Sequence, residues 1–163
     1  MSIRPHDHAM FRSTIIVCLF ALTACSKSSA PKSSVHEMTG SITERVAGVS
    51  AIITKHKAPP TAILDAHFVE EQTGDGVLGP SDFRAFYFVE VAPQDVALWT
   101  QMLTPLGVTA EYDAPAQPRD WWIARGSFAS LQFYKPDILT GRVHGWIGVS
   151  QQTGRIYIFT FTM

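Results

Sequence analysis

The sequence has little cysteine, little charge and no long apolar run. Its 163 residues include 2 cysteines, too few for a disulfide-stapled scaffold or a cysteine-rich zinc site. Charged residues make up 17% of the chain and the formal net charge is −1, so we expect no nucleic-acid partner. The apolar fraction of 46% suits a packed core, and the length suits one ordinary domain.

The longest uncharged apolar stretch lies near the N-terminus, at residues 13–24. A helix of this length rises about 18 Å, which is short of the roughly 30 Å hydrocarbon core of a membrane. Arg4 and Arg12 precede the stretch and small residues end it, a pattern typical of a secretory signal peptide. Met10 is an alternative start of translation, because the residues before it are unusual for a leader.

The apolar stretch ends in the sequence Leu22-Thr23-Ala24-Cys25. This sequence resembles the lipobox of bacterial lipoproteins. The resemblance implies that residues 1–24 are a signal peptide, that cleavage falls before Cys25, and that Cys25 carries lipid such as palmitate. It implies a membrane anchor in the cell envelope. Ser26 follows the cysteine in place of Asp, which favours the outer membrane, facing the periplasm, over the inner membrane.

The remaining chain divides into a tether and a domain. Residues 25–40 are rich in serine, lysine and other small or polar residues, which predicts a flexible tether, and we expect residues 41–163 to form one domain. Ser41 and Glu44 have the spacing of a capping box, which predicts a helix from there to about residue 57. Pro93 is typical of the first turn of a second helix, which we expect to end near residue 107.

Alternating apolar residues predict strands elsewhere in the domain. The predicted strands cover residues 62–71, 83–91, 121–124, 128–134, 142–150 and 155–161. The second of them is apolar on both faces, so we expect it in the centre of a sheet covered on both sides, or at an interface. The expected fold is α+β, with an antiparallel sheet of five to six strands and two helices packed on it.

Motifs for catalysis, metals and cofactors are incomplete in this sequence. Residues 74–79 match G-x-G-x-x-G, but a proline and a predicted strand follow instead of a helix, so we expect no dinucleotide cofactor. Asp65 and His67 share one face of a predicted strand and have no third ligand nearby, so we expect no metal site. None of the common hydrolase or phosphate-loop motifs occurs, and we expect no catalytic residues.

Two aromatic segments are candidate binding sites. Arg142, His144 and Trp146 alternate along a predicted strand and would project from one face, where they suit an anionic, sugar or peptide partner. The alternative is that Trp146 packs in the core and the other two are ordinary exposed residues. Trp121 and Trp122 are adjacent, so we expect one ring to face the core and the other to face outward as a possible anchor.

These observations favour a non-enzymatic envelope lipoprotein that binds another protein or a cell-wall component. A periplasmic inhibitor or immunity protein is one form that such a protein takes. The alternative is a small envelope hydrolase or ligand carrier that uses His144, His67 and nearby acids.

Overall fold

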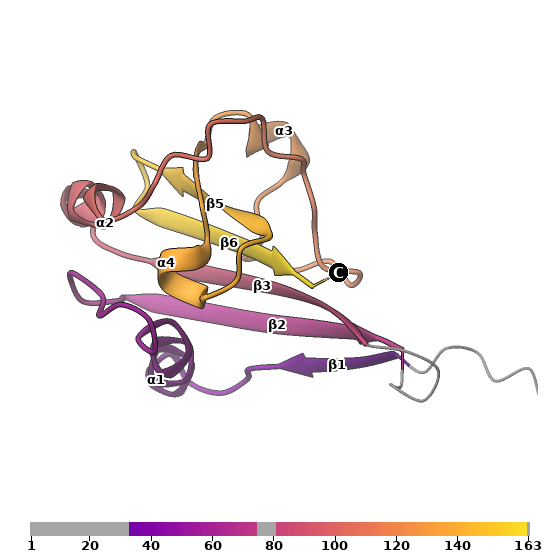
Figure 1. Ribbon diagram of the computed structural model, residues 1–163. Coiled ribbons are helices and arrows are strands. Elements are labelled where there is room, and N and C mark those ends of the chain that lie inside the picture. The colour runs from indigo at the N-terminus through magenta and orange to yellow at the C-terminus, as the bar shows by residue number, and fades with distance from the viewer. Residues whose placement is uncertain (1–32, 75–80, 163) are drawn as a thin grey trace, which may run out of the picture.

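A computed structural model describes residues 33–74 and 81–162 of the chain. The predicted signal peptide, Cys25 and most of the glycine-rich pattern at 74–79 lie outside these residues. Within them, six strands form one antiparallel sheet in the order β1-β2-β3-β6-β5-β4, and Figure 1 shows β1, β2, β3, β6 and β5 one above the other. The predicted α+β class, with an antiparallel sheet, is confirmed.

The sheet and the helices have the following bounds. The strands are β1 (Ser33–Glu37), β2 (Asp65–Thr73), β3 (Asp82–Glu90), β4 (Gln132–Tyr134), β5 (Gly145–Ser150) and β6 (Arg155–Phe161). The helices are α1 (Ile42–Ile53), the 3-10 turn η1 (Pro93–Asp95), α2 (Val96–Gln101), α3 (Arg125–Phe128) and α4 (Asp137–Thr140). The described chain therefore has more helices than the two expected, although α3 and α4 are single turns of 4 residues each.

The first helix begins where the capping box predicts. The Ser41 hydroxyl accepts a hydrogen bond from the Glu44 backbone N–H at 3.3 Å, and the Glu44 carboxylate accepts one from the Ser41 backbone N–H at 2.8 Å. These two bonds satisfy donors that the helix itself leaves unpaired, which stabilises a helix start by about 1 kcal/mol. Val49 and Ile53 are buried and fix α1 against the sheet.

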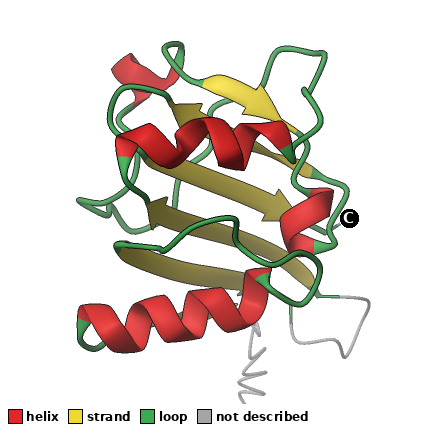
Figure 2. Cartoon of the chain, turned by 90° about the vertical axis from the view of Figure 1, so that its left-hand side faces the viewer, coloured by secondary structure: helices red, strands yellow, loops and turns green. Residues whose placement is uncertain are grey.

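Both sides of the sheet are covered, by different kinds of structure. The helices α1, α2 and α4 pack on one side, the helical face, which is turned toward the viewer in Figure 2. The segment 106–131, which includes α3, crosses the other side, the loop face. In β3 the buried residues Tyr87 and Val89 belong to the first core, and Phe86 and Phe88 belong to the second. The prediction of a central strand covered on both sides is confirmed.

Some predicted strands are wrong because tertiary packing overrides local alternation. Residues 121–124 form no strand, and residues 125–128 form α3. Trp122 and Phe128 both pack onto the loop face, so this segment lies across the sheet instead of pairing with it. The strand predicted over 128–134 is reduced to β4, and the one predicted over 142–150 begins only at Gly145. The second helix ends at Gln101, several residues earlier than expected.

The predicted tether is structured near its end. Residues 33–37 form β1, which pairs with β2 along one edge of the sheet. The segment contains a single apolar residue, Val35, whose side chain is 56% exposed, so hydrophobic alternation does not reveal this strand. Backbone pairing holds it, and its shortness and polar side chains suit an edge position.

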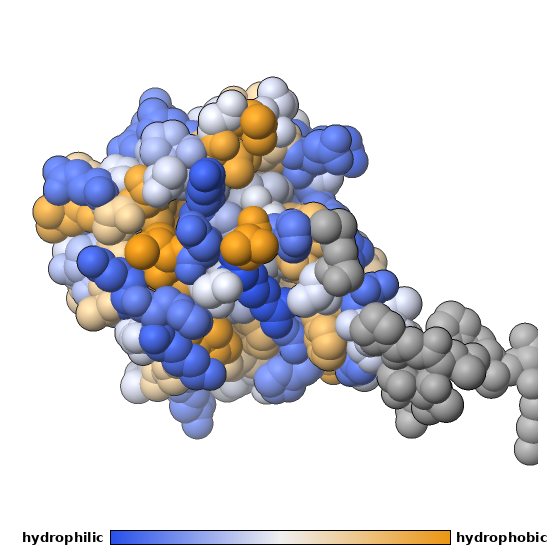
Figure 3. Space-filling model, viewed as in Figure 1, coloured by the Kyte–Doolittle hydropathy of each residue, from blue (hydrophilic) through white to orange (hydrophobic). Residues whose placement is uncertain are grey.

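The exposed surface is mixed in character. On the side drawn in Figure 3, apolar residues are interspersed with polar ones over all the elements in view. None of the helices in the described residues is long and apolar enough to cross a membrane.

Candidate functional site

Strand register brings charged and aromatic side chains together at one end of the loop face. Asp65 of β2 lies opposite Glu90 of β3, which in turn lies opposite Arg155 of β6. Two residues further along the sheet, His67 of β2 lies opposite Phe88 of β3, which in turn lies opposite Tyr157 of β6. Because side chains two residues apart share a face, these are two parallel rows, one charged and one aromatic.

Trp121 lies over the aromatic row. Its ring stacks on the His67 ring with centroids 5.3 Å apart and an interplanar angle of 12°, and it lies 6.5 Å from the Phe88 ring. Trp122 stands edge-on to it at 5.8 Å. Trp121 remains partly exposed, and it lines an open groove of about 900 Å³ together with both rows. We call this cavity the Trp121 groove.

The Trp121 groove is lined from several distant parts of the chain. Its remaining walls come from the end of β1, the start of α1 and the segment 118–127. Arg119 of that segment forms an ion pair of 2.7 Å with Glu37 of β1, which joins the two walls. The lining includes His67 and the charged residues Glu37, Arg45, Asp65, Glu90, Arg119, Asp120 and Arg155.

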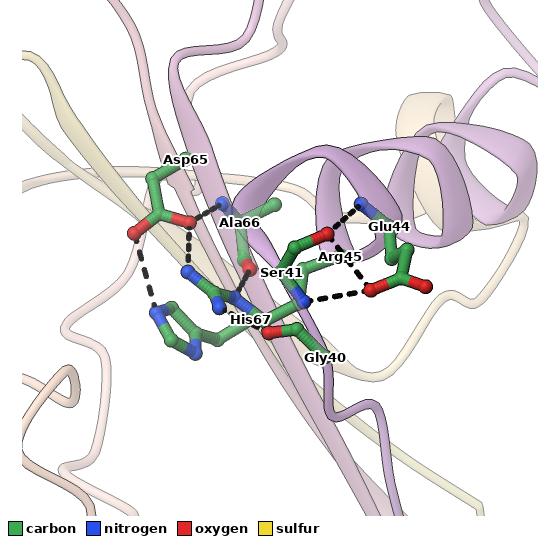
Figure 4. A network of polar contacts seen from close by, with 7 residues as sticks. All are labelled: Gly40, Ser41, Glu44, Arg45, Asp65, Ala66 and His67. Carbon is green, nitrogen blue, oxygen red and sulfur yellow. Dashed lines mark hydrogen bonds and ion pairs between the residues drawn. The ribbon is translucent and has the colours of Figure 1, made fainter.

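A network centred on Arg45 fixes one wall of the groove (Figure 4). The Arg45 guanidinium donates to the carbonyl oxygens of Ala66 and Gly40 at 3.0 and 2.7 Å and to the Asp65 carboxylate at 2.6 Å. The second Asp65 oxygen lies 3.4 Å from Nε2 of His67. His67 is thus held between a carboxylate and the Trp121 ring.

Burial and charge act on these two titratable groups in opposite ways. Burial by itself would raise the pKa of Asp65, but hydrogen bonds from Arg45 and the Ala66 N–H, with the nearby positive charges, hold it below its ordinary value. Burial lowers the pKa of His67 below 6.5, and the neighbouring Asp65 opposes this only in part. At neutral pH Asp65 is therefore ionised and His67 is neutral.

The chemistry open to this site is limited by what surrounds His67. An imidazole beside a carboxylate has the arrangement of a general base. Within the described residues, however, His67 makes no hydrogen bond to a hydroxyl or thiol, and no group of three or more possible metal ligands occurs. What the groove does offer a ligand is the Trp121 ring and several charged side chains.

Two of the tryptophans proposed from the sequence lie in the core. Trp146 is 3% exposed, and its indole N–H donates to the Glu111 carbonyl oxygen at 2.9 Å. Trp122 is 8% exposed and donates to the Asp113 carbonyl oxygen at 2.9 Å. Trp122 faces the core, as expected for one ring of the Trp121–Trp122 pair, whereas Trp121 is partly buried and packs against the same core cluster. Trp146 follows the alternative that was left open, packing in the core.

Arg142, His144 and Trp146 do not form a common surface. Both Arg142 and His144 precede β5, so strand alternation does not apply to them. Arg142 forms an ion pair of 3.0 Å with Glu70. The exposed His144 ring lies 5.4 Å from the Phe161 ring. His144 forms no ion pair with a carboxylate in the described part of the chain, whereas His67 does.

A second cavity, of about 570 Å³, lies at the other end of the loop face. It is mainly apolar, with Trp146, Phe159 and Phe161 along one side and the segment 108–113 along the other. Arg84 borders it and forms ion pairs with Glu71 and Asp113. These pairs leave Arg84 well compensated, so the polar character of this cavity is weaker than that of the Trp121 groove.

Sequence reasoning missed Glu90, Arg155 and Arg45 as groove residues. The first two are the charged residues that end β3 and begin β6, and alternation places each on the same face as a neighbouring aromatic residue. That signal was present, but the pairing of β3 with β6, which brings them together, is not visible in the sequence. Searches against family models, curated proteins and solved structures gave no match to this chain.

Proposed function

We propose that the protein is a non-enzymatic, lipid-anchored binding module of the bacterial cell envelope, and that the Trp121 groove is its ligand site. The anchor rests on the resemblance of Leu22-Thr23-Ala24-Cys25 to a lipobox. The observation that carries the binding role is the groove itself, in which a partly exposed tryptophan lies beside charged residues from three adjacent strands. The expected partners are an envelope protein or a cell-wall component, and an inhibitor or immunity protein is one such module.

Exposed tryptophan beside charged groups is a common composition for a binding hot spot. A large ring with few rotatable bonds loses little entropy on binding and excludes water from neighbouring polar contacts. Trp121 is already held by stacking on His67, and His67 is held by Asp65. The site is therefore ordered before a ligand arrives, which reduces the free-energy cost of binding.

The anchor and the groove are tested separately. Cells that express the full chain are labelled with radioactive palmitate, and we expect label on the wild type and none on Cys25→Ser. The full chain in detergent is then incubated with purified peptidoglycan and with envelope protein extract. We expect retention on one of them that Trp121→Ala abolishes and that Val143→Ala, an exposed residue outside the groove, leaves unchanged. Equal retention of both variants would contradict the groove as ligand site.

The alternative of a small hydrolase is supported by one observation, the contact of His67 with Asp65 inside the groove. An enzyme using this pair would release product from peptidoglycan or an ester substrate, and His67→Gln would abolish release. A ligand carrier would instead retain its ligand in both forms. We favour the binding module because the His67 ring is covered by Trp121 on one face.

A further inference from the structure

The charges of the Trp121 groove do not all compensate one another. Arg45 is paired with Asp65 at 2.6 Å, and Arg119 is paired with Glu37 at 2.7 Å. Three charged lining residues are left, the carboxylates of Glu90 and Asp120 and the guanidinium of Arg155. In the part of the chain that the structure describes, the side chains of Glu90 and Asp120 form no hydrogen bond and no ion pair.

The unpaired groups leave one more negative charge than positive charge in the groove. His67 does not offset this negative charge, because its lowered pKa leaves the imidazole neutral at neutral pH. A cationic group on the ligand would meet a carboxylate at Glu90 and an aromatic ring at Trp121. Both interactions favour a cation, the first by Coulomb attraction and the second through the negative face of the indole.

Trp121 also differs from the other three tryptophans in its indole N–H. The indole N–H groups of Trp99, Trp122 and Trp146 donate to the Thr61 hydroxyl and to the carbonyl oxygens of Asp113 and Glu111, respectively. The Trp121 N–H makes no hydrogen bond within the described residues, and the ring is partly exposed. It is able to donate to a ligand carbonyl, a group that a peptide presents at every residue.

We propose that the Trp121 groove binds a peptide segment of a partner protein through a lysine or arginine side chain, which lies against Trp121 with its charge at Glu90. Arg155, which neighbours Glu90 across the sheet, then faces the carbonyl or carboxylate groups of the same segment. This inference rests on the proposed function, since it names the ligand of the same groove.

The test uses the full chain in detergent, labelled with nitrogen-15, and follows the four indole N–H signals. The probe is the peptide Ac-Ala-Ala-Lys-Ala-Ala-NH2, with its acetyl-lysine counterpart as a neutral control and chitotetraose as a neutral sugar. Trp121→Phe identifies the groove signal by its loss. The indoles of Trp99 and Trp146 are buried, internally bonded and outside the groove, so they serve as internal controls for folding.

We expect the lysine peptide to shift the Trp121 signal and to leave the signals of Trp99 and Trp146 in place, and the acetyl-lysine peptide to have no effect. Glu90→Gln should weaken binding about tenfold, which corresponds to about 1.4 kcal/mol, because it removes the negative charge that attracts the ligand cation. Glu111→Gln removes an exposed carboxylate outside the groove and should change the dissociation constant by less than about twofold, because exposed charges contribute little at a distance.

Two results would overturn the inference. Binding of chitotetraose or of the acetyl-lysine peptide at Trp121, unchanged by Glu90→Gln, would assign the groove to a neutral ligand and leave the proposed function standing. No shift of Trp121 with any probe would refute the cationic peptide. If Trp121→Ala then also failed to reduce retention on envelope material, the proposed function would fall with it.

Discussion

Replacement of Trp146 by phenylalanine is expected to destabilise the fold without affecting the Trp121 groove. The indole of Trp146 packs against Phe128, Phe133 and Phe159, with ring centroids 5.1 to 5.9 Å away, and its N–H donates to Glu111. Phenylalanine removes this donor, so the Glu111 carbonyl oxygen loses its hydrogen bond from the core. The lost hydrogen bond contributes about 1 kcal/mol.

The smaller ring adds a packing term. Two buried ring carbons are lost, which at about 0.8 kcal/mol each amounts to about 1.6 kcal/mol. The expected loss in the free energy of unfolding is therefore about 2.5 kcal/mol, a large fraction of the total for a domain of this size. Trp146→Ala would lose about 3–5 kcal/mol and would risk unfolding the protein.

Trp121→Phe is the matched control, because it makes the same chemical change at a partly exposed ring whose N–H has no acceptor in the described residues. Its expected loss is below about 1 kcal/mol. Urea unfolding of both variants, followed by circular dichroism and extrapolated linearly to water, gives the comparison. A loss at Trp121 equal to or greater than that at Trp146 would refute the assignment of one tryptophan to folding and the other to binding.

Three further predictions follow from individual contacts. The pKa of His67 is lowered in the folded state, so the unfolded chain takes up a proton at this residue first as the pH falls through 6.5. The contribution of His67 to the free energy of unfolding is therefore complete above that pH and declines below it. Urea midpoints measured against pH should show this decline in the wild type and less of it in His67→Gln. Gly145 has φ +118° and a Cβ there would lie 1.9 Å from the Phe159 carbonyl oxygen, so Gly145→Ala should lose about 3 kcal/mol or fail to fold, as judged by thermal unfolding. Truncation after Thr153 removes β6, which pairs with both β3 and β5, so the shortened chain should be digested by trypsin. Resistance to trypsin would show that the sheet survives without β6.

Local patterns in the sequence predicted those parts of the fold that local interactions stabilise. The capping box at Ser41 and the alternation in β2, β3 and β6 each depend on residues close together in the chain, and each is present.

The failures occur where contacts distant in sequence decide the structure. Strand β1 has almost no apolar pattern and exists because β2 offers it a free edge to pair with. The segment 121–128 has strand-like alternation but serves as a cover for the loop face, so its large side chains point to one side. Short apolar segments of this kind take the conformation that buries most surface in the assembled fold.

By itself the sequence determines the α+β class and a near-neutral charge, because each depends on composition or on neighbouring residues; the lipid anchor at Cys25 stays a prediction from its resemblance to a lipobox. Which residues form a site was decided only by the tertiary structure. Asp65, Glu90 and Arg155 become neighbours through the register of β2, β3 and β6, and register is set by the burial of both faces at once. The same packing put Trp146 in the core and left Trp121 at the surface of the groove.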